Sequence, residues 1–286
     1  MTDLPPDPFA IQGPALISFS GGRTSGYMLW RILQAHGGVL PPGVVVGFAN
    51  TGREMPFTLD FVQQCGERWN VPITWLEYRH NKPEGAHRRV RYAEVVNHNN
   101  ASRAGEPFDM LLDSKQIVPD RSRRFCTEEL KVKTIRRYLR GVLKWKHWAN
   151  VVGFRADESA RIERKQENVK AAADLGYHNL FPLAEAGVDL LEVRKFWRDQ
   201  PFDLQLDADG DGGNCDGCFM FPTDRIGRMF LKYPERMDWW VQKESLMRTK
   251  TMRPRKQSFS SIRDAALAGA ALAWDDSAAC EEDCGV

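Results

Sequence analysis

The chain has 286 residues, of which 42% are hydrophobic and 27% charged, which is ordinary for a globular protein. Its 40 basic and 38 acidic side chains leave a net charge of +2, which excludes an overall polycation or polyanion but not local patches. Six cysteines are too few and too unevenly spaced for a disulfide-stapled fold. No basic and apolar leader opens the chain, and no apolar run is long enough to span a bilayer. We therefore expect a soluble cytoplasmic protein with no membrane partner.

From residue 14 onward, short apolar runs alternate with helical patterns. The apolar runs suit central parallel strands, which are buried on both faces. They cover Ala15–Ser20, Val44–Ala49, Ile73–Tyr78 and Trp148–Phe154, with Leu180–Leu183 as a further candidate. Helical patterns lie at Ser25–Ala35, Pro56–Trp69 and Thr127–Leu143. The alternation predicts an α/β fold with a doubly wound, mostly parallel sheet.

The remaining segments suggest how the chain is organised. Residues 1–13 are proline-rich and are expected as a flexible arm, followed by a nucleotide-binding α/β domain over 14–185. A helical C-terminal region is expected over 186–274, and an acidic tail over 275–286. The predicted helices of the C-terminal region are Leu190–Arg198, Thr223–Leu231, Glu235–Met247 and Ser261–Leu272. Weak periodicity over 80–122 is interpreted as an insertion over the sheet edge that becomes ordered with ligand.

The strongest motif runs from Ser18 to Gly26, Ser-Phe-Ser-Gly-Gly-Arg-Thr-Ser-Gly, between the first strand and a helix. Glycines after a strand let the backbone amides approach an anion, and the helix start adds free N–H groups. The hydroxyls of Ser20, Thr24 and Ser25 add donors, Arg23 adds charge, and Ser25 is expected to cap the helix. The motif differs from a P-loop and from a dinucleotide-binding loop. It predicts a phosphate-binding loop, with a plain glycine-rich turn as the alternative.

A second anion site is suggested by Arg155 and Arg161, at the end of a strand and the start of a helix. A guanidinium group binds phosphate or sulfate through two hydrogen bonds, and the Glu158 carboxylate can orient one of these two arginines. A surface ion-pair network is the alternative. Thr51 and Gly52 follow another strand, at the edge where open α/β sheets bind ligands.

Four motifs in order give the chain a resemblance to the PP-loop superfamily, closest to its phosphoadenosine phosphosulfate (PAPS) reductase branch. They are Ser20-Gly21-Gly22, Asn50-Thr51-Gly52, Arg124-Phe125-Cys126-Thr127 with Leu130-Lys131, and Gly153 to Ser159 with Arg161. The resemblance implies catalytic roles for Arg155, Glu158, Arg161 and Cys126. It implies nucleotide binding by Ser18, Ser20, Gly21, Gly22, Arg23, Thr24, Ser25, Asn50, Thr51, Gly52 and Gly153. Thr24 and Asn50 replace acidic residues of the family pattern, and each removes a negative charge beside the expected phosphates.

The cysteines suggest a metal site. Cys215-Asp216-Gly217-Cys218 has a spacing used by zinc and iron–sulfur sites, and its glycine is expected to let both sulfurs point the same way. Cluster-binding members of the resembled family add a Cys-Cys pair, of which this chain retains Cys126. Three thiolates suit a [4Fe-4S] cluster with one open iron; zinc and three buried thiols are the alternatives.

Other acidic and cysteine patterns are interpreted as structural. Residues 207–212 imitate half of an EF-hand, but Cys218 occupies the position of its bidentate glutamate, so an acidic turn is expected. Cys280 and Cys284 lie in the acidic tail, where Asp283-Cys284-Gly285 has only a superficial likeness to the reductases' cysteine-bearing tail. Cys65 is expected in the core.

A basic segment completes the predicted features. Ten Lys and Arg side chains and only two acidic ones lie between Arg121 and Lys146, a local charge of +8. The segment 121–148 suits tRNA, DNA or a doubly phosphorylated nucleotide, with a solvated helix face as the alternative.

The resemblance implies an enzyme that binds ATP with Mg²⁺, or PAPS, and performs sulfur chemistry. One route is adenylation followed by sulfur transfer from a sulfur donor, and the other is sulfonyl reduction with a thioredoxin-like reductant. A catalytically inactive nucleotide- or nucleic-acid-binding module is the alternative.

Overall fold

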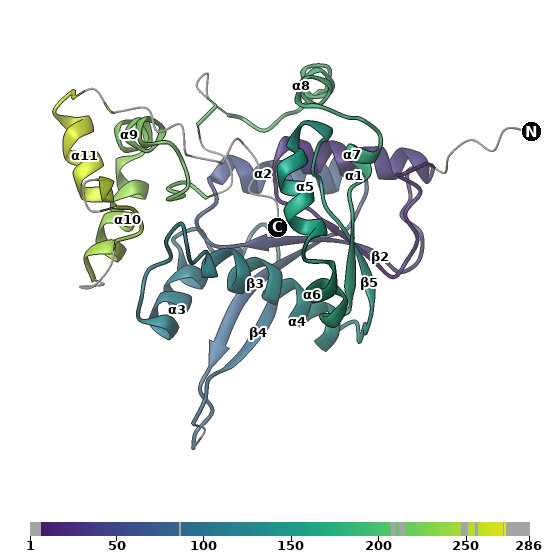
Figure 1. Ribbon diagram of the computed structural model, residues 1–286, viewed down its shortest axis with the longest axis horizontal. Coiled ribbons are helices and arrows are strands. Elements are labelled where there is room, and N and C mark those ends of the chain that lie inside the picture. The colour runs from purple at the N-terminus through teal and green to yellow at the C-terminus, as the bar shows by residue number, and fades with distance from the viewer. Residues whose placement is uncertain are drawn as a thin grey trace, which may run out of the picture.

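The computed structural model of the chain describes residues 7–85, 87–206, 210–211, 215–246, 251–254, 257–270 and 272. Its centre is a six-stranded sheet (Figure 1). The strands are β1 (Ala15–Ser18), β2 (Val44–Asn50), β3 (Ile73–Asn81), β4 (Val90–Val96), β5 (Trp148–Val151) and β6 (Tyr177–Leu180).

Helices connect and cover these strands. They are α1 (Arg23–Ala35), α2 (Pro56–Arg68), α3 (Glu106–Lys115), the π-helical turn η1 (Thr127–Val132), α4 (Lys133–Gly141), the 3₁₀ turn η2 (Ala156–Glu158), α5 (Ser159–Gln166), α6 (Val169–Asp174), α7 (Pro182–Glu185), α8 (Leu190–Arg198), α9 (Thr223–Lys232), α10 (Pro234–Leu246) and α11 (Phe259–Leu267). Local sequence explains several starts. Pro56 begins α2 because the first turn needs no N–H from it. The carboxylate of Asp189 caps α8 by accepting the Glu192 N–H at 2.9 Å.

The strand order is β4-β3-β2-β1-β5-β6, and every neighbouring pair is parallel except β3 with β4. From the central strand β1, the chain builds β2 and β3 on one side and β5 and β6 on the other. The order therefore reverses between β1 and β5, and ligands of open α/β sheets bind outside the carboxyl ends of the strands at such a point. The predicted α/β class with a mostly parallel sheet is confirmed.

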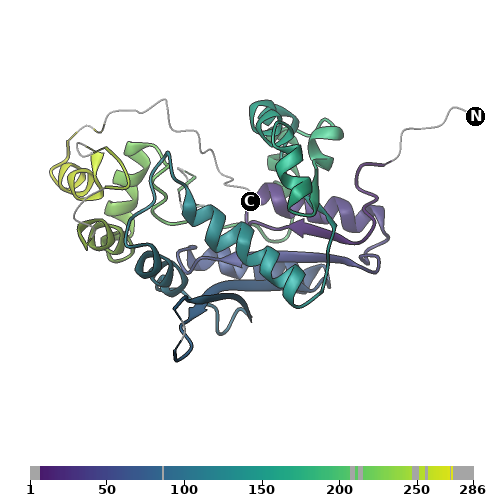
Figure 2. The same ribbon diagram turned by 60° about the horizontal axis from the view of Figure 1, so that its bottom comes forward.

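Helices cover both faces of the sheet. On one face α1, α2 and α8 enclose a core that includes Ile17 of β1 and Trp197 of α8 (Figure 1). On the other face, η1 and α4 form one continuous helical segment that crosses the sheet (Figure 2), and Leu16 packs there with Leu139. Neighbouring residues of β1 thus pack into cores on opposite faces of the sheet, because successive side chains of a strand point to opposite faces.

The last helices form a second cluster beside the carboxyl edge of β2 and β3 (Figure 1). Trp240 of α10 and Phe259 of α11 are buried there with Phe108 of α3. α8, which the sequence groups with the C-terminal helices, instead packs on α1. The expected boundary at residue 185 therefore does not separate two cores.

Three local expectations differ from the structure: a candidate strand, the segment 80–122 and the N-terminal arm. The candidate strand Leu180–Leu183 lies three residues too late, because β6 ends at Leu180 and Pro182 opens α7. Residues 80–122 contain an antiparallel edge strand, β4, and helix α3. Val90 and Val95 of β4 are 52% and 56% exposed, so this edge strand lacks the apolar pattern by which a buried strand is predicted.

The described part of the expected N-terminal arm, residues 7–13, packs against the α/β core. Phe9 and Ile11 are buried, and the guanidinium of Arg31 lies 4.2 Å from the centre of the Phe9 ring. Because the expected arm is proline-rich, its composition does not reveal that Phe9 and Ile11 are buried. Among the described residues, no helix has the length and apolar character needed to cross a membrane.

Candidate functional site

The Ser18–Gly26 loop joins β1 to α1 and closes on itself through hydroxyls. The Ser25 hydroxyl accepts the Ser20 N–H at 3.2 Å, lies 2.9 Å from the Ser20 hydroxyl and donates to the Gly22 carbonyl at 3.0 Å. Gly21 has φ of +82°, and a Cβ there would lie 3.0 Å from Thr58. Only glycine fits this left-handed, crowded position.

Helix α1 begins at Arg23, with Gly22 as its N-cap and no side-chain cap. The expectation that Ser25 caps the helix is therefore wrong, because Ser25 lies inside the first turn and bonds back to the loop. The first amides of α1 consequently keep their hydrogen-bonding capacity and the positive end of the helix dipole. A loop closed by hydroxyls and followed by an uncapped helix is suited to an anion.

Arg23 does not add its charge to the loop. Its guanidinium forks onto the Asp203 carboxylate, with Nε–Oδ1 and Nη2–Oδ2 distances of 2.8 and 2.7 Å. The Arg23 carbonyl also accepts the indole N–H of Trp197 at 2.7 Å. Arg23 thus fastens the start of α1 to the segment that follows α8.

Arg155 lies beside the loop, and its guanidinium pairs with the Asp157 carboxylate, with Nε–Oδ1 and Nη2–Oδ2 distances of 3.0 and 3.2 Å. It is 4% exposed, and its Nη1 donates to the Thr24 hydroxyl at 3.2 Å. Its backbone N–H donates to the Glu158 carboxylate at 3.0 Å, and that carboxylate also pairs with Arg161. Gly153, just before Arg155, lies against Ser25, where an added Cβ would be 3.5 Å from the Ser25 Cα. The structure therefore places the Arg155 segment directly on the loop.

The loop after β2 is held by two buried carboxylates. The Asn50 amide donates to Glu77 of β3 at 2.6 Å and to the Ser102 carbonyl at 2.9 Å, while its oxygen accepts the Gly52 N–H at 3.0 Å. The Glu54 carboxylate accepts from the Thr51 N–H and hydroxyl at 2.8 and 2.9 Å. An amide at position 50 thus satisfies the buried Glu77, which an aspartate there would repel.

The Cys-x-x-Cys segment lies against this loop. The Cys215 sulfur is 3.7 Å from the Thr51 hydroxyl, and Cys215 forms an isolated antiparallel bridge with Glu54. Burial raises the pKa of the Cys215 thiol well above its ordinary value, and the Glu54 carboxylate raises it further. Burial also raises the pKa of Cys126 to about 11, assisted by repulsion from Cys218. The three thiols thus lie near enough to influence one another.

Lys131 is one of the cations beside these thiols, together with Arg124, which acts on Cys126 and Cys218. Lys131 is 6% exposed, in the π-helical turn η1. Its charge lowers the pKa values of Cys126, Cys215 and Glu54, against the larger effect of burial. Single π-helical turns inside α-helices are frequent at functional sites. A thiolate formed here would have this ammonium as its counter-charge.

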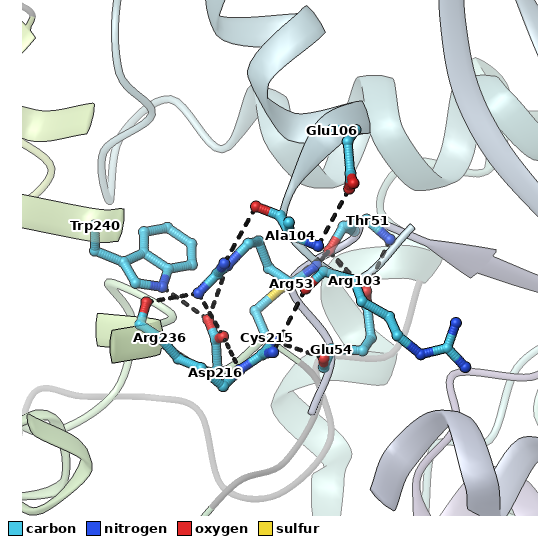
Figure 3. Close-up of polar contacts among 10 residues, drawn as sticks. All are labelled: Thr51, Arg53, Glu54, Arg103, Ala104, Glu106, Cys215, Asp216, Arg236 and Trp240. Carbon is cyan, nitrogen blue, oxygen red and sulfur yellow. Dashed lines mark hydrogen bonds and ion pairs between the residues drawn. The ribbon is translucent and has the colours of Figure 1, made fainter. Parts of the chain in front are cut away.

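Asp216, between the two cysteines, anchors the segment (Figure 3). Its buried carboxylate pairs with Arg53 at 2.6 Å and with Arg236 at 2.7 Å, and it accepts the Trp240 indole N–H at 2.8 Å. Gly217 does not have a left-handed backbone; instead, a Cβ there would lie 2.2 Å from Trp240 Nε1. The glycine is thus required for close packing, rather than for the turn expected from the sequence.

The described residues contain no group of three or more His, Cys, Asp or Glu side chains arranged to hold a metal ion. Cys126, Cys215 and Cys218 are free thiols close to one another, without a fourth donor in such an arrangement. As these thiols are placed in the described residues, they are not arranged around a metal ion.

Sequence reasoning assigned no individual role to the residues that support the site, although Lys131 and Asp216 lie within its motifs. Glu54, Glu77, Lys131 and Asp216 are buried. A charged residue inside an apolar run is the signal that could have marked Glu77 in Ile73–Tyr78, since buried charge requires a partner. Asp207, Asp209, Gly212, Cys280 and Cys284 lie outside the described residues, so the acidic turn and tail cysteines stay predictions.

The basic segment is partly neutralised. The two acidic side chains lie on η1, where Glu129 pairs with Lys133 at 3.0 Å and with Arg137 at 3.1 Å. Glu128 pairs with Lys133 at 2.6 Å. Arg136 makes no ion pair or hydrogen bond with another described residue. Part of the predicted positive surface therefore remains available.

The fold and site define a class: an α/β protein with a hydroxyl-rich glycine loop at the switch point of its sheet and a cysteine cluster at the neighbouring strand end. No family model matches the chain. It is 30% identical over 213 residues to the uncharacterized nin region protein ORF290 of Escherichia phage lambda, a match covering 74% of this chain and 68% of that protein. The chain belongs to the family of that phage protein.

Proposed function

We propose that this protein is a PAPS reductase-like PP-loop enzyme that binds an adenine nucleotide, ATP or PAPS, and carries out sulfur chemistry. In this proposal the doubly wound sheet is a PP-loop fold, and its switch point between β1 and β5 is the nucleotide site. The Ser18–Gly26 loop supplies backbone amides and the start of α1 to a phosphate group. Arg155, buried beside Thr24, supplies a charged hydrogen-bond donor.

The observation that carries the sulfur part of the proposal is the 3.7 Å contact between the Thr51 hydroxyl and the Cys215 sulfur. It brings the Cys-x-x-Cys segment to the strand end next to the phosphate loop. Cys126 joins the same cluster, and Lys131 can stabilise a thiolate there. A nucleotide site and a group of thiols at adjoining strand ends suit a reaction between sulfur and an activated nucleotide.

Two reactions fit this arrangement. In adenylation, a substrate oxygen attacks the α-phosphorus of ATP, and the bond to the β-phosphate breaks to release pyrophosphate. A sulfur nucleophile from a sulfur donor then displaces AMP. In reduction, a cysteine thiolate attacks the sulfonyl sulfur of PAPS and releases adenosine 3′,5′-bisphosphate. A thioredoxin-like dithiol then attacks that cysteine, releases sulfite and is oxidised to a disulfide.

Product analysis separates the reactions. The protein is incubated with ATP and candidate acceptors, or with PAPS and thioredoxin, and pyrophosphate, AMP and sulfite are measured. Cys215→Ser is expected to lose sulfur-dependent product, whereas Cys65→Ala, a change in a buried helix remote in sequence, serves as the matched control. No product and no nucleotide binding under either condition would overturn the proposal.

The metal ions expected from the sequence stay predictions. They are Mg²⁺ with ATP and a [4Fe-4S] cluster, or zinc, on Cys126, Cys215 and Cys218. Anaerobic purification followed by iron and zinc analysis tests the cluster. Metal retained by the wild type and lost from Cys215→Ser would support it, and a metal-free wild-type protein would refute it.

A second function, a catalytically inactive nucleotide- or nucleic-acid-binding module, is favoured by one observation. The Asn50 amide is engaged by Glu77, Ser102 and Gly52, and Thr24 by Arg155, so neither family acid position offers a carboxylate. In this alternative the segment 121–148 binds tRNA or DNA. ATP binding without pyrophosphate release, with any nucleic acid supplied, would support it.

A further inference from the structure

A pocket lies on the α4 face of the sheet, at β1, β5 and β6. It is an open pocket, with about 410 Å³ of empty space when the solvent at its mouth is included. Trp148 and Tyr177 line it, with ring centres 5.7 Å apart and planes inclined by 24°. Val132 and Ile135, on the helical segment of η1 and α4, form its apolar wall. The pocket thus offers aromatic and aliphatic surface to a planar group.

A line of polar side chains crosses the sheet at this pocket. The Ser18 hydroxyl donates to the Asn150 oxygen at 2.9 Å, and the Asn150 amide donates to the Asn179 oxygen at 2.8 Å. Ser18 and Asn150 line the pocket. Hydroxyl and amide groups beside aromatic rings are the means by which proteins hydrogen-bond the edges of unstacked bases.

The pocket is positively charged without compensation. Arg136 of α4 and Lys165 of α5 line it, no acidic side chain does, and neither cation has a partner among the described residues. Arg161 and Arg124 act on Lys165 and, with burial, lower its pKa. Two such cations at the edge of an aromatic pocket can bind an anion attached to the group that enters it.

Further cations extend from the pocket along the protein surface. Arg140 in the last turn of α4, and Lys144 and Lys146 on the connection to β5, are exposed, and the Arg140 guanidinium lies 6.0 Å from the centre of the Trp148 ring. Arg124 is exposed on the Lys165 side. Single-stranded nucleic acids are bound by this combination, in which bases stack on aromatic rings and a cationic track follows the phosphates.

We infer that this pocket receives one unstacked base of a single-stranded nucleic acid, whose flanking phosphates contact Arg136 and Lys165. The inference rests on the nucleic-acid partner proposed above for the segment 121–148, and the pocket shares Ser18 with the nucleotide loop. It assigns stacking to Tyr177, because Trp148 beneath it is buried, and it assigns Asn150 to the edge of the base.

Photocrosslinking of the full chain tests this inference. The probe is a labelled single strand of about 12 nucleotides, DNA or RNA, carrying 5-iodouracil; this length is within the range of common binding sites. Crosslinks mapped by mass spectrometry are expected at Tyr177, and Tyr177→Leu should remove them. Crosslinks confined to other segments would overturn the assignment.

Affinity for the same strand provides a second measurement. Arg136→Gln with Lys165→Gln should weaken binding at least tenfold, while Arg164→Gln, an exposed cation next to Lys165 on α5, should change it less than twofold. An equal loss in both proteins would indicate general charge attraction and overturn the pocket. Competition by AMP as strong as by the strand would overturn the strand as ligand.

The two proposals fail separately. Ser20→Ala with Arg155→Ala removes contacts of the phosphate loop but not the pocket rim, so the crosslink should persist in that protein. A protein that binds no ATP but still gives the Tyr177 crosslink would contradict the proposed enzyme and support the base pocket. A protein that binds ATP but gives no crosslink would support the nucleotide site and contradict the base pocket.

Discussion

The phosphate loop and the cysteine cluster lie at neighbouring strand ends but are built differently. The Ser18–Gly26 loop is closed by hydrogen bonds within its own sequence, from the Ser20 N–H to the Ser25 hydroxyl and from that hydroxyl to the Gly22 carbonyl. The cysteine cluster requires Asp216, whose carboxylate binds Arg53, 163 residues away, and Trp240. A contiguous motif can form a site with little support, whereas a distributed one depends on a buried polar network. The two sites should therefore respond differently to mutation.

The largest expected effect is on the cysteine cluster. Asp216→Ala leaves the buried Arg53 guanidinium without its carboxylate and should lower the free energy of unfolding by about 3–5 kcal/mol, measured by urea titration. Asp216→Asn should cost less, because an amide oxygen can still accept hydrogen bonds. Asp60→Ala, at an exposed pair with His98, is the control and should stay within about 0.5 kcal/mol of the wild type. Unchanged stability of Asp216→Ala would show that the network does not hold the cluster.

A second prediction concerns the phosphate loop. Ser20→Ala with Arg155→Ala removes a hydroxyl and a charged donor, at roughly 1.5–3 kcal/mol for the charged contact alone, so nucleotide affinity should fall about 100-fold. Calorimetry with ATP and PAPS measures this fall, and Arg164→Ala on the exposed side of α5 is the control. Arg155 is buried and also pairs with Asp157 and Glu158, so the double variant should lose some stability, and a urea titration establishes that the calorimetry is done on folded protein. Wild-type affinity in the double variant would refute the nucleotide site.

The packing of Gly217 gives a smaller effect. In Gly217→Ala the new methyl group would lie 2.2 Å from Trp240 Nε1, so the indole or the loop must move. We expect a loss of about 1–3 kcal/mol in unfolding free energy. Gly141→Ala, where nothing lies within 4 Å of the added Cβ, is the matched control and should be neutral. Equal behaviour of both variants would mean that the Cys-x-x-Cys segment is not tightly packed on α10.

The smallest effect is kinetic and leaves the fold unchanged. With its pKa raised to about 11 from 9.0, Cys126 in metal-free protein should carry roughly 100-fold less thiolate at pH 8 than an ordinary thiol. Iodoacetamide labelling, followed by peptide mass spectrometry, should accelerate about tenfold per pH unit until pH approaches 11. Urea-unfolded protein is the control. A labelling rate that levels off near pH 7 would contradict the raised pKa.

Prediction from sequence succeeded where the signal was local and failed where partners were remote. The strands β1, β2, β3 and β5 and most helices were found because apolar runs and their breaks are contiguous. The role of Arg23 was wrong because its partner, Asp203, lies 180 residues away. The exposed edge strand β4 was missed because neither face presents a continuous buried pattern.

The sequence by itself determined the alternating α/β order and the glycine loop, since both follow from backbone conformation and apolar spacing over a few residues. It also located Cys126, Cys215 and Cys218 as a set. Only the tertiary structure decided that the Cys-x-x-Cys segment lies on Thr51, that Asn50 satisfies the buried Glu77, and that two unpaired cations rim an aromatic pocket. Burial makes charges interact strongly with whatever lies near them, and which groups are near is a property of the folded chain alone.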